Sequence, residues 1–231
     1  MKINFLSKIW DKAYRLNEKN ILDLIKYNNE AKILDLGCDD GLWSMQLAKK
    51  AGTSKIFGVD IVESRVEKAC EKGVTAIMAD LNNKLPYEDN SFDVIHANQV
   101  IEHIANLDLF VSEIYRVLKP GGYTVISTEN GSSWHNIFAS IMGWQIFSLT
   151  NISSKKLGIG NPLAILRNNV IDLSSWTHKT IFNYRGLKEF FQAHGFSRIK
   201  IMGAGYHPLT PSIGKIDPRH SHFLALKAFK K

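Results

Sequence analysis

One stretch near the N-terminal end constrains the fold of this chain more than any other. The apolar run 32–36 contains Asp35, a turn bounded by Gly37 and Gly41 follows it, and a helical pattern begins directly after the turn. A second apolar run leads into Asp60, 19 positions beyond Gly41. A strand, a glycine turn and a helix in this order bring bare backbone against a ligand at the helix N-terminus, and the second acid can accept hydrogen bonds from a ribose. The stretch therefore predicts an α/β unit that binds a nucleoside.

Strand-like apolar runs alternate with helical patterns along the chain. After an amphipathic helical leader over residues 1–29, the alternating segments are 32–36, 41–50, 55–59, 62–72, 74–78, 92–97, 107–118 and 122–128. The last third adds a helical pattern at 183–194 and strands near 197–203 and 221–227. This alternation predicts a doubly wound, mostly parallel sheet with helices on both faces. A length of 231 residues suits a single domain, residues 1–231.

Two common nucleotide-binding turns do not fit the residues after the first strand. A dinucleotide loop needs glycines at 37, 39 and 42, but Asp39 and Leu42 stand at two of these positions. No Gly-Lys-Ser or Gly-Lys-Thr follows the turn, which excludes a P-loop. The acids around the turn favour a ligand that carries positive charge and no phosphate. S-adenosylmethionine is a ligand of this kind, because it has a sulfonium, an ammonium and an unphosphorylated ribose.

The turn Asp35-Leu36-Gly37-Cys38-Asp39-Asp40-Gly41 resembles the D-x-G-x-G-x-G first motif of class I S-adenosylmethionine-dependent methyltransferases, in their small-molecule, type 11-like branch. Asp39 replaces the middle glycine, and Asp tolerates left-handed backbone better than most residues. Further motifs resemble those of the family, in family order, over roughly residues 30–128. They are Ala79-Asp80-Leu81, the fourth strand from Ser91 to Asn98, the segment Ile101-Glu102-His103-Ile104, and Leu118-Lys119-Pro120-Gly121-Gly122.

The resemblance implies a Rossmann-like sheet of seven strands, mostly parallel, with an antiparallel final strand. It implies S-adenosylmethionine as cofactor, S-adenosylhomocysteine as product, and no metal. Asp60 is then expected to bind the ribose, and Asp80 the adenine amino group. The full set of expected cofactor-binding residues is Asp35, Gly37, Cys38, Asp39, Gly41, Asp60, Ile61, Asp80, Leu81 and Asn98. For Cys38 we expect contact through the backbone and a packing role for the thiol.

Two of the eight histidines are candidate catalytic residues. Methyl transfer from a sulfonium needs a base only if the acceptor must lose a proton, and histidine serves near neutral pH. His178 lies in a segment, Trp176-Thr177-His178-Lys179, that resembles a histidine-bearing segment before the last helix in many family members. His103 follows the fourth strand. A structural role is the alternative for both residues, and His135 is a third, weaker candidate.

Residues 129–180 form a segment too long for an ordinary connection between the fifth strand and the last helix. The segment contains three tryptophans and leaves the sheet at the edge where α/β sheets bind ligands. We therefore expect a lid over the acceptor, with a packed helical hairpin without function as the alternative. Its apolar stretch 137–149 is shorter than the roughly 20 residues that span a bilayer, but it suits peripheral contact with a membrane.

Absent motifs and the distribution of charge narrow the acceptor. No N/D-P-P-Y/F segment, which usually accompanies methylation of exocyclic amines on bases, follows the fourth strand. Carbon-5 methylation of pyrimidines needs a cysteine nucleophile in that region, and neither cysteine lies there. No RNA-binding module is recognisable. Residues 1–130 carry a net charge of −3 and residues 131–231 of +10. The basic second half is consistent with an anionic acceptor or surface, with a solvated basic surface as the alternative. We expect a small-molecule, saccharide or lipid-linked acceptor methylated on oxygen. An RNA methyltransferase and a non-catalytic S-adenosylmethionine-binding protein are the alternatives.

The two cysteines, Cys38 and Cys70, form no disulfide framework and no metal-binding pattern. The first ten residues lack the continuous apolar core of a signal peptide. We therefore expect a reduced, cytoplasmic protein.

Overall fold

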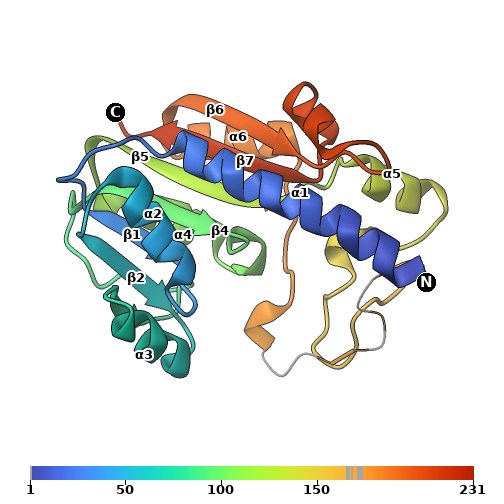
Figure 1. Ribbon diagram of the computed structural model, residues 1–231, viewed down its shortest axis with the longest axis horizontal. Coiled ribbons are helices and arrows are strands. Elements are labelled where there is room, and N and C mark those ends of the chain that lie inside the picture. Colours follow the sequence, from blue (N-terminus) through green and yellow to red (C-terminus); the bar gives the residue numbers. More distant parts are fainter. Residues whose placement is uncertain (1, 165–166, 168, 171–173) are drawn as a thin grey trace.

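A computed structural model describes residues 2–164, 167, 169–170 and 174–231 (Figure 1). A long helix, α1 (Lys2–Leu24), precedes a regular alternation of strands and helices. The first half of that alternation is β1 (Ile33–Leu36), α2 (Leu42–Ala51), β2 (Ile56–Asp60), α3 (Glu63–Glu71), β3 (Thr75–Met78), β4 (Phe92–Asn98) and α4 (Leu107–Val117). The second half is β5 (Leu118–Glu129), α5 (Trp134–Ile141), α6 (Tyr184–Ala193), β6 (Ser197–Ala204) and β7 (Phe223–Phe229). Short 3-10 helices at Ile101–His103, Phe147–Leu149, Ser174–Trp176, Pro211–Lys215 and Pro218–His220 lie in the connections.

The strands form one seven-stranded sheet in the order β3-β2-β1-β4-β5-β7-β6. Strands β1 to β5 are parallel, and β7 runs antiparallel to both β5 and β6. This topology confirms the predicted doubly wound sheet and its antiparallel final strand. The chain leaves β1 toward β2 and later returns to β4 on the other side of β1. The order therefore reverses between β1 and β4, where open α/β sheets bind their ligands.

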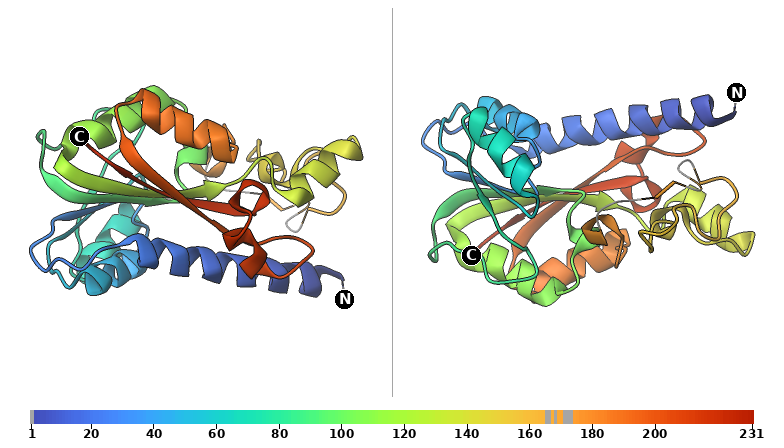
Figure 2. Two further views of the ribbon diagram at one scale, coloured as in Figure 1. Left: turned by 90° about the horizontal axis from the view of Figure 1, so that it is seen from above. Right: turned by 90° about the horizontal axis from the view of Figure 1, so that it is seen from below.

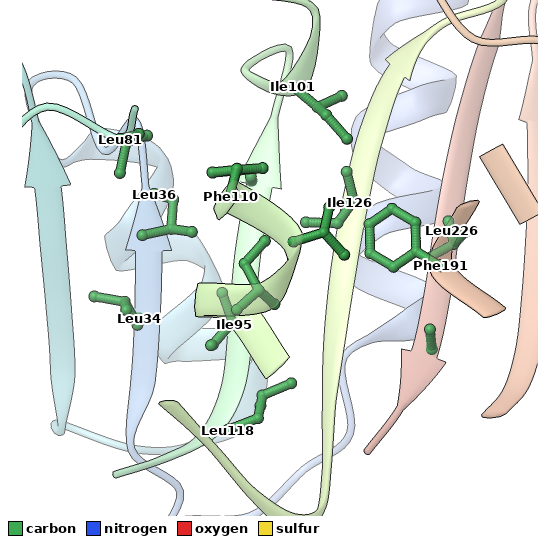
Figure 3. Close-up of a cluster of buried hydrophobic side chains, with 14 of the residues drawn as sticks. Leu34, Leu36, Leu81, Ile95, Ile101, Phe110, Leu118, Ile126, Phe191 and Leu226 are labelled. Carbon is green, nitrogen blue, oxygen red and sulfur yellow. The ribbon is translucent and has the colours of Figure 1, made fainter. Parts of the chain in front are cut away.

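Helices cover both faces of the sheet, as Figure 2 shows in two edge-on views. One face packs against α1, α2 and α3, and their buried core includes Ile21, Leu47 and Ala69. The other face packs against α4 and α6. The sequence of α4 explains this packing. Its apolar residues 110, 111, 114 and 117 lie on one face of the helix, and all four are buried. Figure 3 shows this second core, in which Phe110 and Phe191 lie against the aliphatic side chains of the strands.

The predicted helical leader is one continuous helix, α1. The structure differs from the predicted elements at the start of β5. Strand β5 begins at Leu118, so Lys119-Pro120-Gly121-Gly122 forms a bulge inside the strand and not a turn before it. Phe92 pairs with Leu118 and Val94 with Tyr123, which leaves one residue of β4 opposite the four residues 119–122 of β5. Gly121 takes a φ of 77° in this bulge. The predicted turn became a bulge because β4 and β5 pair on both sides of residues 119–122. This pairing between distant segments cannot be read from the residues of the turn.

The segment 129–180 carries α5 and two of the short 3-10 helices beyond the end of β5. Residues 165–166, 168 and 171–173 of the predicted lid lie outside the described residues. Among the helices that the structure describes, none is long and apolar enough to cross a bilayer.

Candidate active site

A cavity of about 1400 Å³ lies at the carboxyl ends of the parallel strands. The loops after β1, β2, β3 and β4 form one part of its wall. Helix α1, the segment 129–180, the loop after β6 and His222 contribute other parts. Pockets for a single small ligand are typically about 300–1,000 Å³. The cavity therefore has room for a nucleoside cofactor and an acceptor together.

Eight of the ten predicted cofactor residues line this cavity. They are Gly37, Cys38, Asp39, Asp60, Ile61, Asp80, Leu81 and Asn98. The loops that carry them are far apart in sequence, but the parallel sheet brings the ends of its strands to one edge. Asp35 and Gly41 are not part of the wall.

The turn after β1 uses left-handed backbone at three residues. Gly37, Asp39 and Gly41 have φ values of 74°, 49° and 79°. A Cβ on Gly37 would lie 2.5 Å from Cγ2 of Val100, and one on Gly41 would lie 2.9 Å from Cα of Ala69. Both glycines are therefore required by space as well as by conformation. Asp39 adopts the left-handed conformation in place of the missing glycine, as its residue type allows.

The carboxylate of Asp60 joins the first two loops. Its Oδ2 accepts the backbone N–H of Asp39 at 3.0 Å, and its Oδ1 accepts that of Val62 at 3.0 Å. A carboxylate has about four acceptor positions, so this one can still accept two hydroxyls. Asp80 is similar: Oδ1 accepts two bonds from Asn82, and Oδ2 has no partner among the described residues. These acceptor oxygens therefore fit a ribose diol at Asp60 and an exocyclic amine at Asp80.

Asp35 lies in a buried polar network beside the cavity. Its Oδ2 accepts the hydroxyl of Ser44 at 2.5 Å, and its Oδ1 accepts Nδ1–H of His96 at 2.7 Å. The other nitrogen of His96 accepts the indole N–H of Trp43 at 3.3 Å. Asp35 is buried in this network and is not part of the cavity wall, and its expected contact with the cofactor stays a prediction.

The thiol of Cys38 is buried in the core beside the turn. Burial, and then the negative charges of Asp35 and Asp60, raise the pKa of Cys38 well above its ordinary value. A protonated, buried thiol agrees with the expected packing role.

The two predicted catalytic histidines lie side by side in the cavity, with ring centroids 4.8 Å apart. Nδ1 of His103 contacts the carbonyl of Thr177 at 3.2 Å, and Nδ1 of His178 contacts that of Ser148 at 2.6 Å. A carbonyl only accepts, so each Nδ1 donates the hydrogen bond and leaves Nε2 of each ring for a ligand. Burial and the neighbouring His178 lower the pKa of His103 to about 4, which keeps this ring neutral at pH 7.

Two carboxyl groups that sequence reasoning did not single out also line the cavity, Glu102 and Glu129. Oε2 of Glu102 accepts the hydroxyl of Thr128 at 3.0 Å, while its buried Oε1 has no partner among the described residues. Burial, together with the charge of Glu129, raises the pKa of Glu102 to about 8. Burial also acts to raise the pKa of Glu129, but its contacts with His222 and His178 outweigh this and lower it to about 2. The cavity thus holds one protonated and one ionised carboxyl group at neutral pH.

Arg65 connects the segment 129–180 to the turn after β1 (residues 37–41, the cofactor turn). Arg65 on α3 pairs with Asp39, and its guanidinium lies over the ring of Trp176, 5.0 Å from the ring centroid. From the opposite side, α1 contributes Trp10 and Tyr14, whose rings stack at 4.9 Å. Aromatic side chains from two segments that are far apart in the sequence therefore line the cavity.

The fold and this cavity define an α/β enzyme that binds a nucleoside cofactor at the switch point of its sheet. Residues 27–173 match a family model described as a methyltransferase domain. The chain belongs to this family and is an S-adenosylmethionine-dependent methyltransferase of class I fold.

Known proteins with similar sequences or structures agree with this assignment. The demethylmenaquinone methyltransferase of Staphylococcus aureus is 26% identical over 208 residues, which span 86% of this chain and 80% of that protein. A methyltransferase from Thermotoga maritima, described as a possible histamine N-methyltransferase, has a TM-score of 0.61 at 19% identity and covers 97% of this chain and 94% of its own. Phosphoethanolamine N-methyltransferase 2 of Haemonchus contortus, solved with S-adenosyl-L-methionine, has a TM-score of 0.61 at 18% identity over 93% of this chain and 52% of its own.

Proposed function

We propose that this enzyme transfers the methyl group of S-adenosylmethionine to an oxygen of a small-molecule acceptor, a saccharide or a lipid-linked intermediate. Asp60 would bind the ribose of the cofactor and Asp80 its adenine amino group. The cofactor supplies an activated methyl group on sulfonium. The residues of the chain then have two tasks: they hold the acceptor oxygen in line with the methyl group, and they take up the proton of the hydroxyl.

The pair His103 and His178 is the observation that carries this proposal. Both rings are tethered at Nδ1 to backbone carbonyls and leave Nε2 for a ligand within the cofactor cavity. A hydroxyl bound there would donate its hydrogen bond to an imidazole, which accepts the proton as the methyl group is transferred. The protonated Glu102 forms a group with these rings, because one ligand atom from each of the three residues lies within 4.8 Å of the others. Its unpartnered Oε1 can donate a hydrogen bond to the acceptor.

The wall of the cavity supports the acceptor class. Trp10, Tyr14 and Phe147 supply flat apolar surface, which suits a sugar ring or a lipid-bearing ring. Phe138 and Ile141 of α5 and the following Met142 are exposed, within the stretch predicted to touch membranes. The similar protein from Staphylococcus aureus is named for a small-molecule quinone acceptor. These features favour a small acceptor over a polymer.

Methyl transfer to a defined panel tests the proposal. The purified chain is incubated with S-adenosylmethionine and with nucleotide sugars, short-chain lipid-linked saccharides, quinols or generic RNA, and release of S-adenosylhomocysteine is measured. We expect transfer to an oxygen of a non-RNA acceptor. His103→Gln and His178→Gln should each lower kcat by about 10²–10⁴-fold, the usual contribution of a general base. Affinity for S-adenosylhomocysteine should stay within about twofold, since neither side chain is assigned to the cofactor.

A matched control and two alternatives make the result decisive. His194→Gln changes a histidine at the end of α6, outside the cavity wall, and should retain transfer. Salt-dependent binding to generic RNA, together with methylation of RNA, would contradict the proposal and support an RNA methyltransferase. Cofactor binding without transfer to any acceptor would support a non-catalytic S-adenosylmethionine-binding protein.

A further inference from the structure

A second group of histidines lies in the cavity wall and has no part in the proposed proton transfer. His135 comes from α5, His207 from the loop after β6, and His222 directly precedes β7. One ring nitrogen from each residue lies within 4.8 Å of those of the other two. The three ring centroids are 4.4, 4.9 and 5.1 Å apart, so the rings surround a common point.

The second nitrogen of two of these rings meets a different group. Nδ1 of His222 lies 2.8 Å from Nε2 of His207, while Nε2 of His222 points to the carboxylate of Glu129, 3.9 Å from Oε1. Nε2 of His135 lies 3.3 Å from the hydroxyl of Ser133. Metal-binding histidines characteristically use one nitrogen for the ion and the other for a carboxylate or another polar group. In both His135 and His222, Nε2 faces a polar group and Nδ1 is left for an ion.

An unpartnered nitrogen points independently to a ligand at this place. Nδ1 of His135 is buried and has no hydrogen-bond partner within the described part of the chain. A buried polar atom without a partner costs about 1–3 kcal/mol. A bound cation would satisfy this atom and would take the place of the proton in the hydrogen bond between Nε2 of His207 and Nδ1 of His222.

We propose that His135, His207 and His222 bind one divalent transition-metal ion of the zinc class. Three imidazole nitrogens suit Zn²⁺, which binds histidine at about 2.0–2.1 Å, and Glu129 would orient His222 and balance part of the positive charge. Sites with three protein ligands leave a fourth position open, and here that position faces the cavity. This inference replaces the expectation from the sequence that no metal is bound.

The site would act on the acceptor, and this part of the inference rests on the proposed function. A hydroxyl or phosphate oxygen of the acceptor could occupy the fourth position on the ion. An ion so placed lowers the pKa of a bound hydroxyl and orients it. The basic second half of the chain and the metal would then both select an oxygen-rich, anionic acceptor.

Zinc binding by the full chain, measured without cofactor or acceptor, tests the site. The protein is stripped with a chelator and titrated with ZnCl₂ by calorimetry and by competition with a chelating dye, and Co²⁺ is added separately for its absorption spectrum. We expect one ion per chain with a Kd below about 1 μM, and a Co²⁺ spectrum typical of nitrogen ligands. His207→Gln, His222→Gln and His135→Gln should each weaken binding at least about 100-fold, and Glu129→Gln about 10–100-fold.

The controls separate failure of this site from failure of the proposed function. His194→Gln should bind zinc like the wild type, and circular dichroism checks the folding of every variant. His207 is only half-buried, so His207→Gln keeps the test valid if the His222 variant does not fold. No saturable binding by the wild type, or unchanged binding by the His207 variant, would overturn the site. Loss of binding in His103→Gln and His178→Gln, with binding retained in His207→Gln, would place the metal elsewhere and also overturn it.

Discussion

Among single residues, Asp60 has the most direct bearing on the cofactor, because its carboxylate fastens the turn after β1 to the loop after β2. Asp60→Ala removes the expected ribose contact and releases the backbone N–H of Asp39. We expect affinity for S-adenosylhomocysteine to fall by about 1–3 kcal/mol, the usual effect of losing a buried hydrogen-bond partner. Isothermal titration calorimetry measures this directly.

Asp89→Ala provides the matched control for that measurement. Asp89 pairs with Arg116 outside the cavity wall, so its removal should leave affinity for the cofactor unchanged. Equal affinity of the Asp60 variant and the wild type would refute the assigned contact.

Glu102 gives a prediction about pH. Its pKa is about 8 in the folded chain because of burial and Glu129, compared with an ordinary value of 4.5. Between these values the folded state holds a proton that the unfolded state has lost. The stabilising contribution is therefore complete below about pH 4.5 and is lost as the pH rises through about 8. In Glu102→Gln this contribution to pH dependence disappears.

Urea denaturation at several pH values checks the sign. From pH 5 to pH 8, the free energy of unfolding of the wild type should fall relative to the variant by up to about 1.4 kcal/mol per pH unit. Glu189→Gln, on the exposed side of α6, controls for the change of side-chain chemistry. Parallel curves for the wild type and Glu102→Gln would show that Glu102 is ionised in the fold.

At the scale of elements, the segment 129–180 is predicted to act as a lid over the site. Trp176 meets Arg65, which pairs with Asp39 of the cofactor turn, so cofactor binding should stabilise this contact. We expect hydrogen exchange of peptides within 134–164 and 174–180 to slow when S-adenosylhomocysteine and an acceptor are added. Helix α4, on the other side of the sheet from α1 and α2, is the internal reference. Equal protection throughout the segment in both states would favour a packed hairpin without a lid function.

The bounds of the elements show which parts of the fold local sequence patterns can predict. Strands β1 to β4 and helices α2, α3, α4 and α6 lie within one or two residues of their predicted ranges, because their apolar periodicity matches the face they bury. The start of β5 could not be predicted, because the bulge at 119–122 depends on pairing with β4. His207 and His222 carried no signal either: they are separated by 14 residues and fit no short metal-binding spacing.

At the scale of the whole molecule, stability depends on the two cores on either side of the sheet. Phe191 of α6 is fully buried against β5 and β7 in one of them (Figure 3). Phe191→Ala should lower the free energy of unfolding by about 3–5 kcal/mol, since it leaves a cavity in a closely packed core. Its neighbour Phe190 is only half-buried, so Phe190→Ala should cost clearly less. Urea denaturation of both variants checks the order, and equal losses would contradict the assigned packing.

The sequence by itself determined the sheet, the cofactor class and the glycine turn after β1. Each of these depends on local chemistry: apolar periodicity, glycines where φ is positive, and acids at strand ends. The tertiary structure alone decided that Asp35 is buried beneath the turn with His96, that Glu102 is protonated beside His103 and His178, and that three further histidines converge. The physical reason is that burial and proximity between distant segments are set by tertiary packing. Such packing produces no local pattern or spacing in the sequence from which these contacts could be predicted.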